Sequence, residues 1–134
     1  MVYKHIVMWK FKEQHNGKSA LENARWMKEQ LEALVGVVPE LLSAEVGISP
    51  ALEQAAAVPS DAAAAQSNAA AAPSNAAAVP APAASGEYDA CLVSTFASPE
   101  ALAAYKVHPK HKAISAYCKE ARLKRLAFDW WSEE

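Results

Sequence analysis

The sequence predicts a single α+β domain with the order strand, helix, strand, strand, helix, strand. Three observations lead to this fold class. Two amphipathic helical patterns, each opened by a capping signal, lie among four segments rich in β-forming residues. Residues 50–86 hold 18 alanines among 37 positions and too few large apolar side chains for a second core. The rest of the chain is long enough for one small domain.

The first strand is predicted over residues 2–11, where β-forming side chains alternate. Both faces of this strand carry large apolar groups, such as Trp9 on one face and Ile6 on the other. The first helix follows from Ser19, because Ser-Ala-Leu-Glu fits a capping box and apolar residues then recur at three- and four-residue steps. This helix is expected to end before Gly36.

The second and third strands are predicted over 41–48 and 88–96, so the alanine- and proline-rich insert at about 50–86 lies in the connection between them. Within the insert, residues 59–79 are three tandem copies of one seven-residue unit. The insert has little to bury, and it is expected to be a mobile or partly helical tether without chemistry of its own.

The second helical region opens at Ser98, which is followed by a proline and a glutamate, and it runs through Tyr105. Pro109 is expected to interrupt it, and helical spacing resumes over 114–121. Residues 126–131 close the chain as the fourth strand. This βαββαβ order is that of the ferredoxin-like unit, a four-stranded antiparallel sheet with its helices on one face.

A sheet with helices on one face leaves its other face without a cover. That second face cannot be wholly polar here, because the first strand is apolar on both sides and Trp130 and Trp131 point in opposite directions. We therefore predict a homodimer that packs sheet face against sheet face. The alternative is a cover supplied by the chain's own tail or insert.

The composition excludes several classes of partner. The formal net charge is −2, which predicts no general attraction to nucleic acid or to anionic lipid. No apolar run approaches the roughly 18 residues of a membrane-spanning helix, so we expect no membrane partner and a cytoplasmic protein. Cys91 and Cys118 are too few for a disulfide scaffold or a four-cysteine zinc site, and they are expected to be buried reduced thiols.

Several short motifs together resemble the stress-responsive A/B barrel (Dabb) domain family of dimeric α+β barrels. They are Lys-His-Ile-Val at 4–7, Tyr-Asp at 88–89, and Tyr-Lys-Val-His-Pro-Lys-His at 105–111. The resemblance covers nearly all of the chain outside the insert, which has no counterpart in the family pattern. It implies a homodimer whose two sheets form a barrel, with a small cavity between sheet and helices in each protomer.

The resemblance also implies a candidate site. One plant branch of the family acts as a polyketide cyclase, which closes a linear poly-β-keto thioester by an aldol condensation without metal or cofactor. The residues that serve that site fall on His5, Tyr105 and His111 here. A histidine can be neutral and still accept a proton near neutral pH, so His111 is the expected base, Tyr105 the donor to the enolate oxygen, and His5 a positioning group.

Three functions stay open at this point. The first is a dimer of unassigned activity that binds a small, partly apolar molecule. The second is the cyclase-like acid–base enzyme. The third is a haem or metal protein, in which His5, His108 and His111 hold a transition metal or one helix histidine ligates haem, as related barrels bind it.

The second helical region and the residues after it are also rich in basic side chains. They form either a solvated face or a positive rim that favours an anionic ligand. These residues are Lys106, Lys110, Lys112, Lys119, Arg122, Lys124 and Arg125.

Overall fold

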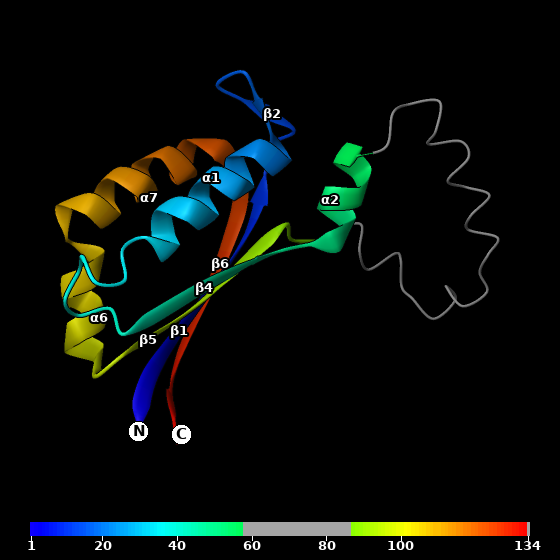
Figure 1. Ribbon diagram of the computed structural model, residues 1–134. Coiled ribbons are helices and arrows are strands. Elements are labelled where there is room, and N and C mark those ends of the chain that lie inside the picture. Colours follow the sequence, from blue (N-terminus) through cyan, green and yellow to red (C-terminus); the bar gives the residue numbers. More distant parts are fainter. Residues whose placement is uncertain (58–86, 134) are drawn as a thin grey trace, which may run out of the picture.

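The structure, a computed structural model, describes residues 1–57 and 87–133. Its centre is a four-stranded antiparallel sheet with the strand order β4-β5-β1-β6 (Figure 1). The two central strands, β5 and β1, are therefore not neighbours in the sequence, which is the arrangement of the ferredoxin-like fold. The strands are β1 (Val2–Phe11), β4 (Ser43–Ile48), β5 (Ala90–Phe96) and β6 (Arg122–Ser132).

The helices α1 and α7 lie on the same side of this sheet, and α6 precedes α7 (Figure 1). Their bounds are Ala20–Glu32 for α1, Pro99–Lys106 for α6 and Pro109–Ala121 for α7. The predicted fold class, α+β with helices on one face of an antiparallel sheet, is confirmed. Two-residue strands β2 (Gln14–His15) and β3 (Lys18–Ser19) add a small hairpin before α1.

The predicted helix starts are confirmed by their capping bonds. The Ser19 hydroxyl accepts from the backbone N–H of Glu22 at 3.1 Å, and the Glu22 carboxylate accepts from that of Ser19 at 2.9 Å. Ser98 caps α6 through a single bond, since its hydroxyl accepts from the N–H of Ala101 at 3.1 Å. Pro109 opens α7 after a two-residue break, so this helix begins before residue 114, from which the sequence predicts helical spacing. Gly36 follows α1 with φ +90°, a conformation that glycine adopts without strain.

Three strand starts differ from the sequence prediction. The closing strand begins at Arg122 rather than at residue 126, because its first residues pair with the end of β1 across a register shift between Lys10 and Phe11. The second strand begins at Ser43 rather than at 41, and the third at Ala90 rather than at 88.

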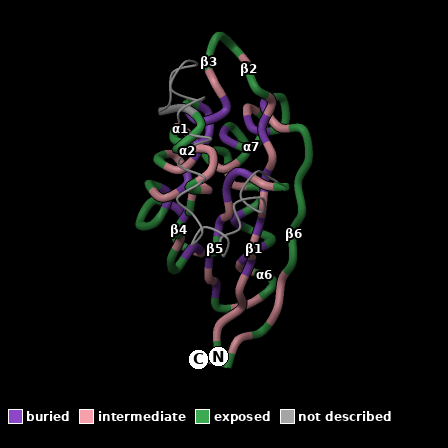
Figure 2. Tube along the Cα trace, turned by 90° about the vertical axis from the view of Figure 1, so that its right-hand side faces the viewer, coloured by how far each residue is buried: buried purple, intermediate pink, exposed green. Residues whose placement is uncertain are grey.

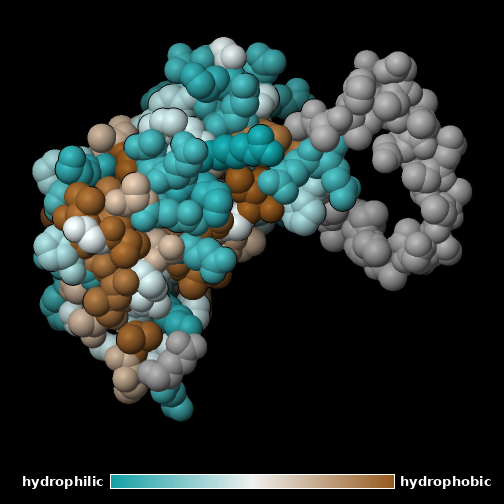
Figure 3. Space-filling model, in the orientation of Figure 1, coloured by the Kyte–Doolittle hydropathy of each residue, from teal (hydrophilic) through white to brown (hydrophobic). Residues whose placement is uncertain are grey.

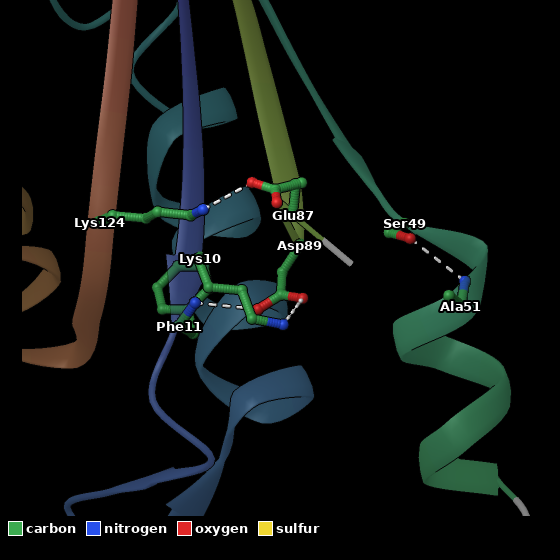
Figure 4. Close-up of polar contacts among 7 residues, drawn as sticks. All are labelled: Lys10, Phe11, Ser49, Ala51, Glu87, Asp89 and Lys124. Atoms are coloured by element: carbon green, nitrogen blue, oxygen red, sulfur yellow. Dashed lines mark hydrogen bonds and ion pairs between the residues drawn. The ribbon is translucent and has the colours of Figure 1, made fainter. Parts of the chain in front are cut away.

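Part of the insert is also ordered. Residues Pro50–Ala57 form a helix, α2, whose Leu52 side chain packs against the core. Its first turn is supported by Ser49, whose hydroxyl accepts from the N–H of Ala51 at 3.2 Å (Figure 4). The repeats at 59–79 lie outside the described residues.

A buried carboxylate fixes the distorted end of β1. Asp89 is 4% exposed, and it accepts hydrogen bonds from the Phe11 N–H at 2.9 Å and from Lys10 Nζ at 3.2 Å (Figure 4). The Asp89 N–H in turn donates to the carbonyl of Trp9 at 2.7 Å. Asp89 thus provides hydrogen-bond partners for both backbone and side-chain groups of β1 at the point where the β1–β6 register shifts.

The core lies between the helices and the face of the sheet that carries Val7, Phe11 and Phe96. Of the two predicted buried thiols, Cys118 is in this core, whereas Cys91 is only half-buried on the opposite face. Both are free. Burial raises the pKa of Cys118 to about 12, so this thiol stays protonated.

The opposite face of the sheet carries an apolar patch. In the strand register, Ile6 lies between Val93 and Phe128, and Met8 lies next to Leu126. Phe128 is 64% exposed and Leu126 52% exposed, and Figure 2 shows β6 exposed along much of its length at the sheet edge. We call Ile6, Met8, Val93, Leu126, Phe128 and Trp130 the outer-face patch.

Hydrophilic side chains cover much of the surface in the view of Figure 3. Hydrophobic side chains gather at the left, over α6 and the loop that follows α1, and near the middle, between α1 and α2. Exposed valines of these segments are Val35, Val37 and Val107. Among the described residues, no helix is both long and apolar enough to cross a membrane, and the cytoplasmic location stays a prediction.

Candidate functional site

A cavity of about 240 Å³ lies between the sheet and α7. Apolar side chains from β1, α1, β5 and α7 form much of its wall, and polar side chains form the rest. Its lining residues are His5, Val7, Trp9, Leu31, Leu92, Lys106, His111, Ile114, Ser115, Cys118, Arg122 and Arg125. This cavity is where the sequence-predicted histidines meet.

His5 lies on the inner face of β1, directly opposite Asp129 of β6. Its Nδ1 is 2.5 Å from Asp129 Oδ1. A carboxylate can only accept, so Nδ1 carries the proton and Nε2 keeps a free lone pair. Burial lowers the pKa of His5, and the hydrogen bond and charge of Asp129 oppose this effect without overcoming it.

His111 lies in the first turn of α7, and its Nδ1 donates to the backbone carbonyl of Lys106 at 3.2 Å. This bond selects the same tautomer as in His5, with Nε2 as the unprotonated nitrogen. Burial again lowers the pKa of His111. Both histidines are therefore neutral at pH 7, and each presents one ring nitrogen that can accept a proton.

Tyr105 stands apart from the cavity. Its side chain is fully buried, and its ring packs against His111 with the ring centroids 4.4 Å apart and against Phe96 at 5.1 Å. Tyr105 is not among the described residues that line the cavity. Its hydroxyl oxygen has no hydrogen-bond partner in the described part of the chain, and burial raises its pKa far above the ordinary value. The structure thus unites His5 and His111 and places Tyr105 behind His111.

The three-histidine metal site, one of the alternatives that the sequence left open, is not formed by the described residues. His108 is the N-cap of α7, where its Nδ1 accepts from the N–H of Lys110 at 3.1 Å, so it shapes the turn before Pro109. Over residues 1–57 and 87–133, no group of three or more His, Cys, Asp or Glu side chains could hold a metal ion. The cavity is also smaller than the roughly 300–1,000 Å³ of sites for drug-sized ligands, so it does not fit haem.

Only some of the predicted basic residues border the cavity. Lys106, Arg122 and Arg125 line it. Lys110 and Lys112, which the sequence places in the same rim, do not: Lys110 borders a separate hollow between α1 and α7, and Lys112 is exposed on α7. The positive rim is therefore formed mainly by the start of β6 rather than by α7.

Asp129 is the site residue that the sequence prediction missed. The alternation of the last strand puts Asp129 on the face opposite to Phe128, which is the inner face. The alternation of the strand residues therefore predicts the face on which Asp129 lies. The pairing of Asp129 with His5 depends on a strand register between the two ends of the chain, which the sequence does not define.

Comparison with known proteins agrees with this architecture. The family model described as "Stress responsive A/B Barrel Domain" matches residues 3–64 and 75–132. Among curated proteins, none matches the sequence.

Solved structures show the same fold at low sequence identity. A dimeric protein of unknown function with a ferredoxin-like fold from Bacteroides fragilis has a TM-score of 0.65 and 19% identity, over 98% of this chain and 96% of that chain. The Arabidopsis thaliana protein At3g17210 has a TM-score of 0.63 and 20% identity, over 98% and 96%. A hydroxynitrile lyase from Passiflora edulis has a TM-score of 0.63 and 12% identity, over 99% and 95%.

Proposed function

The chain belongs to the stress-responsive A/B barrel domain family, and from this premise we propose that it is a homodimer in which each protomer binds a small, partly apolar molecule in the cavity between the sheet and α7. The observation that carries the proposal is the cavity itself, with apolar walls and two histidine Nε2 atoms that have no hydrogen-bond partner among the described residues. A few placed polar groups in an apolar pocket are typical of small-molecule sites. Fold alone does not define a reaction, and a protein of similar fold is described as a hydroxynitrile lyase.

The outer-face patch supports the homodimer. Large apolar side chains that stand exposed together on one sheet face are typical of an interface. Several proteins of similar fold are described as dimeric. Packing two such faces together encloses a barrel and removes the patch from water.

Sedimentation tests this assembly. We expect Phe128→Glu to convert the dimer into a monomer, because it puts a charge on the self-complementary face. The control is Val107→Glu, whose residue is equally exposed, at 65%, but lies after α6 on the other side of the sheet. A wild-type protein that stays monomeric at micromolar concentration would contradict the dimer.

Ligand binding is tested with benzamide, a small neutral molecule with an apolar ring. We expect benzamide to shift the imidazole NMR signals of His5 and His111. Ser115 lines the cavity and its neighbour Ala116 does not, although both are exposed on α7. Ser115→Trp should therefore block binding, whereas Ala116→Trp should leave it intact. Equal binding by both variants would place benzamide elsewhere and refute the proposal.

One observation favours acid–base chemistry at this site as a second candidate function. Asp129 holds the His5 imidazole in one orientation and stabilises its protonated form, which is the arrangement of an oriented general base. In this reaction His5 Nε2 takes a proton from a carbon next to a carbonyl group. The electron pair of the broken C–H bond moves to the carbonyl oxygen, and the resulting enolate is stabilised by the cations of the cavity.

Phenylacetone, an enolisable ketone, provides the test. In D₂O, NMR should show that the protein accelerates deuterium exchange at the carbon between the ring and the carbonyl group. His5→Ala should reduce the protein-dependent rate about hundredfold, within the usual range for a general base. The control His15→Ala removes a histidine that packs against Tyr117 away from the cavity. Exchange that is equal in wild type and His5→Ala would exclude this activity.

A further inference from the structure

The cavity concentrates positive charge in a chain that is slightly acidic overall. Lys106, Arg122 and Arg125 line it, and no acidic residue does so in the part of the chain that the structure describes. The nearby carboxylate of Asp129 is bonded to His5. No ion pair among residues 1–57 and 87–133 involves any of the three cations.

These cations also act on one another and on the histidines. Burial and the neighbouring Arg122 lower the pKa of Arg125, and the charge of Asp129 opposes this effect without overcoming it. Lys106 and Arg125 add to the effect of burial on His5 and on His111, whose pKa values are lowered. Like charges held around one small cavity repel each other, so the free site has an unfavourable field that an anion would relieve.

We propose that the ligand of the cavity is a small carboxylic acid, whose carboxylate is bound by Lys106, Arg122 and Arg125 while its apolar part lies against Val7, Leu92 and Ile114. This inference rests on the proposed binding function and specifies the ligand class. The guanidinium group matches a carboxylate with two parallel hydrogen bonds, so two arginines that line one cavity favour a carboxylate over a neutral amide. The cavity volume of about 240 Å³ restricts the acid to a small one.

Benzoate and benzamide test the inference, because they have the same shape and differ in charge. We expect the wild-type protein to bind benzoate about tenfold more tightly than benzamide, as measured by NMR titration of the His5 and His111 signals. Added salt should weaken the binding of benzoate and leave that of benzamide nearly unchanged.

Substitutions test whether the preference for benzoate over benzamide depends on the cavity cations. Arg122→Gln/Arg125→Gln should weaken benzoate about tenfold and change benzamide less than twofold. The matched control is Lys112→Gln/Lys119→Gln, which removes the same charge from exposed positions of α7 that do not line the cavity, and it should change benzoate less than twofold. Arg122→Lys/Arg125→Lys keeps the charge but loses the two parallel hydrogen bonds, so its benzoate affinity should fall between those of the wild type and of the glutamine variant, which separates loss of charge from loss of folding.

The outcomes distinguish this inference from the proposal on which it rests. Equal affinity for benzoate and benzamide in the wild-type protein overturns the carboxylate preference and leaves small-molecule binding in place. Equal loss of benzoate in the cavity variant and in the control shows that only net charge matters, and it also overturns the inference. Binding of neither probe refutes both.

Discussion

The buried hydroxyl of Tyr105 makes a prediction with an unusual sign: Tyr105→Phe should stabilise the free protein. The side chain is fully buried, and its oxygen has no partner among the described residues. A buried hydroxyl without a hydrogen bond costs about 1–3 kcal/mol. The void left by one oxygen atom, roughly 15 Å³, costs about 0.4 kcal/mol in return. We therefore expect the free energy of unfolding to rise by about 1–2 kcal/mol, which is about 3–6 °C in Tm for a domain of this size.

Tyr117→Phe is the matched control for this prediction. Tyr117 also packs beside aromatic rings, but its hydroxyl donates to Asn23 Oδ1 at 2.5 Å. Its removal leaves the carbonyl oxygen of the buried Asn23 side chain without that donor, so this variant should lose about 1–3 kcal/mol. The same chemical change thus has opposite effects at the two positions.

Urea unfolding and calorimetry at one fixed protein concentration measure both variants, since the stability of a dimer depends on concentration. A loss of stability in Tyr105→Phe equal to that in Tyr117→Phe would refute the reasoning, because it would mean that the Tyr105 hydroxyl is hydrogen-bonded in solution. A gain would mean that the chain keeps a hydroxyl that costs stability. Such a cost is expected of a group retained for function.

Three further predictions concern stability and pH. Ser19→Ala should lower the free energy of unfolding by about 1 kcal/mol, because it removes the hydroxyl that accepts from the Glu22 N–H at the start of α1. An unchanged urea midpoint would contradict this prediction. Asp89→Asn should lower the free energy of unfolding by about 2–3 kcal/mol in the same assay, because it removes the charge that faces Lys10 and one of the two carboxylate acceptors. A loss below about 0.5 kcal/mol, as in ordinary surface substitutions, would contradict the role of these two hydrogen bonds. The free energy of unfolding should fall as the pH drops below about 6.5, because burial lowers the pKa values of His5 and His111 in the folded state and the unfolded chain then binds more protons. Equal stability at pH 7.5 and pH 5 would contradict the burial of these two histidines.

The sequence predicts the helix starts well because capping depends on residues within four positions. The N–H groups that Ser19 and Ser98 cap lie three residues after each serine, and both helices begin where predicted. The start of β6 is different. Residues 122–125 show no apolar alternation, and they form a strand because they pair with the end of β1. Leu52 likewise orders the beginning of the insert through a tertiary contact that no local pattern contains.

The candidate site was predictable to a similar degree. The family resemblance implied His5 and His111, and the structure brings both to one cavity. The third predicted residue, Tyr105, is adjacent in the fold but buried behind His111. The residues that surround Tyr105 depend on the orientation of α6 relative to α7, which the break before Pro109 separates. Helical spacing within one segment does not define that rotation, which is also why Lys110 was misplaced in the rim.

The charges of the cavity connect ligand binding to the proton affinity of the histidines. Burial lowers the pKa of His5 and of His111, and the charges of Lys106 and Arg125 lower both further. A carboxylate bound between these cations brings an opposite charge, which favours the protonated imidazoles and raises both pKa values. Benzoate should therefore raise the pKa of both histidines in an NMR titration, and benzamide should not. Because binding and protonation are linked, benzoate should also bind more tightly as the pH falls toward these pKa values. Histidine pKa values that benzoate leaves unchanged would contradict this coupling between the cavity cations and the two imidazoles.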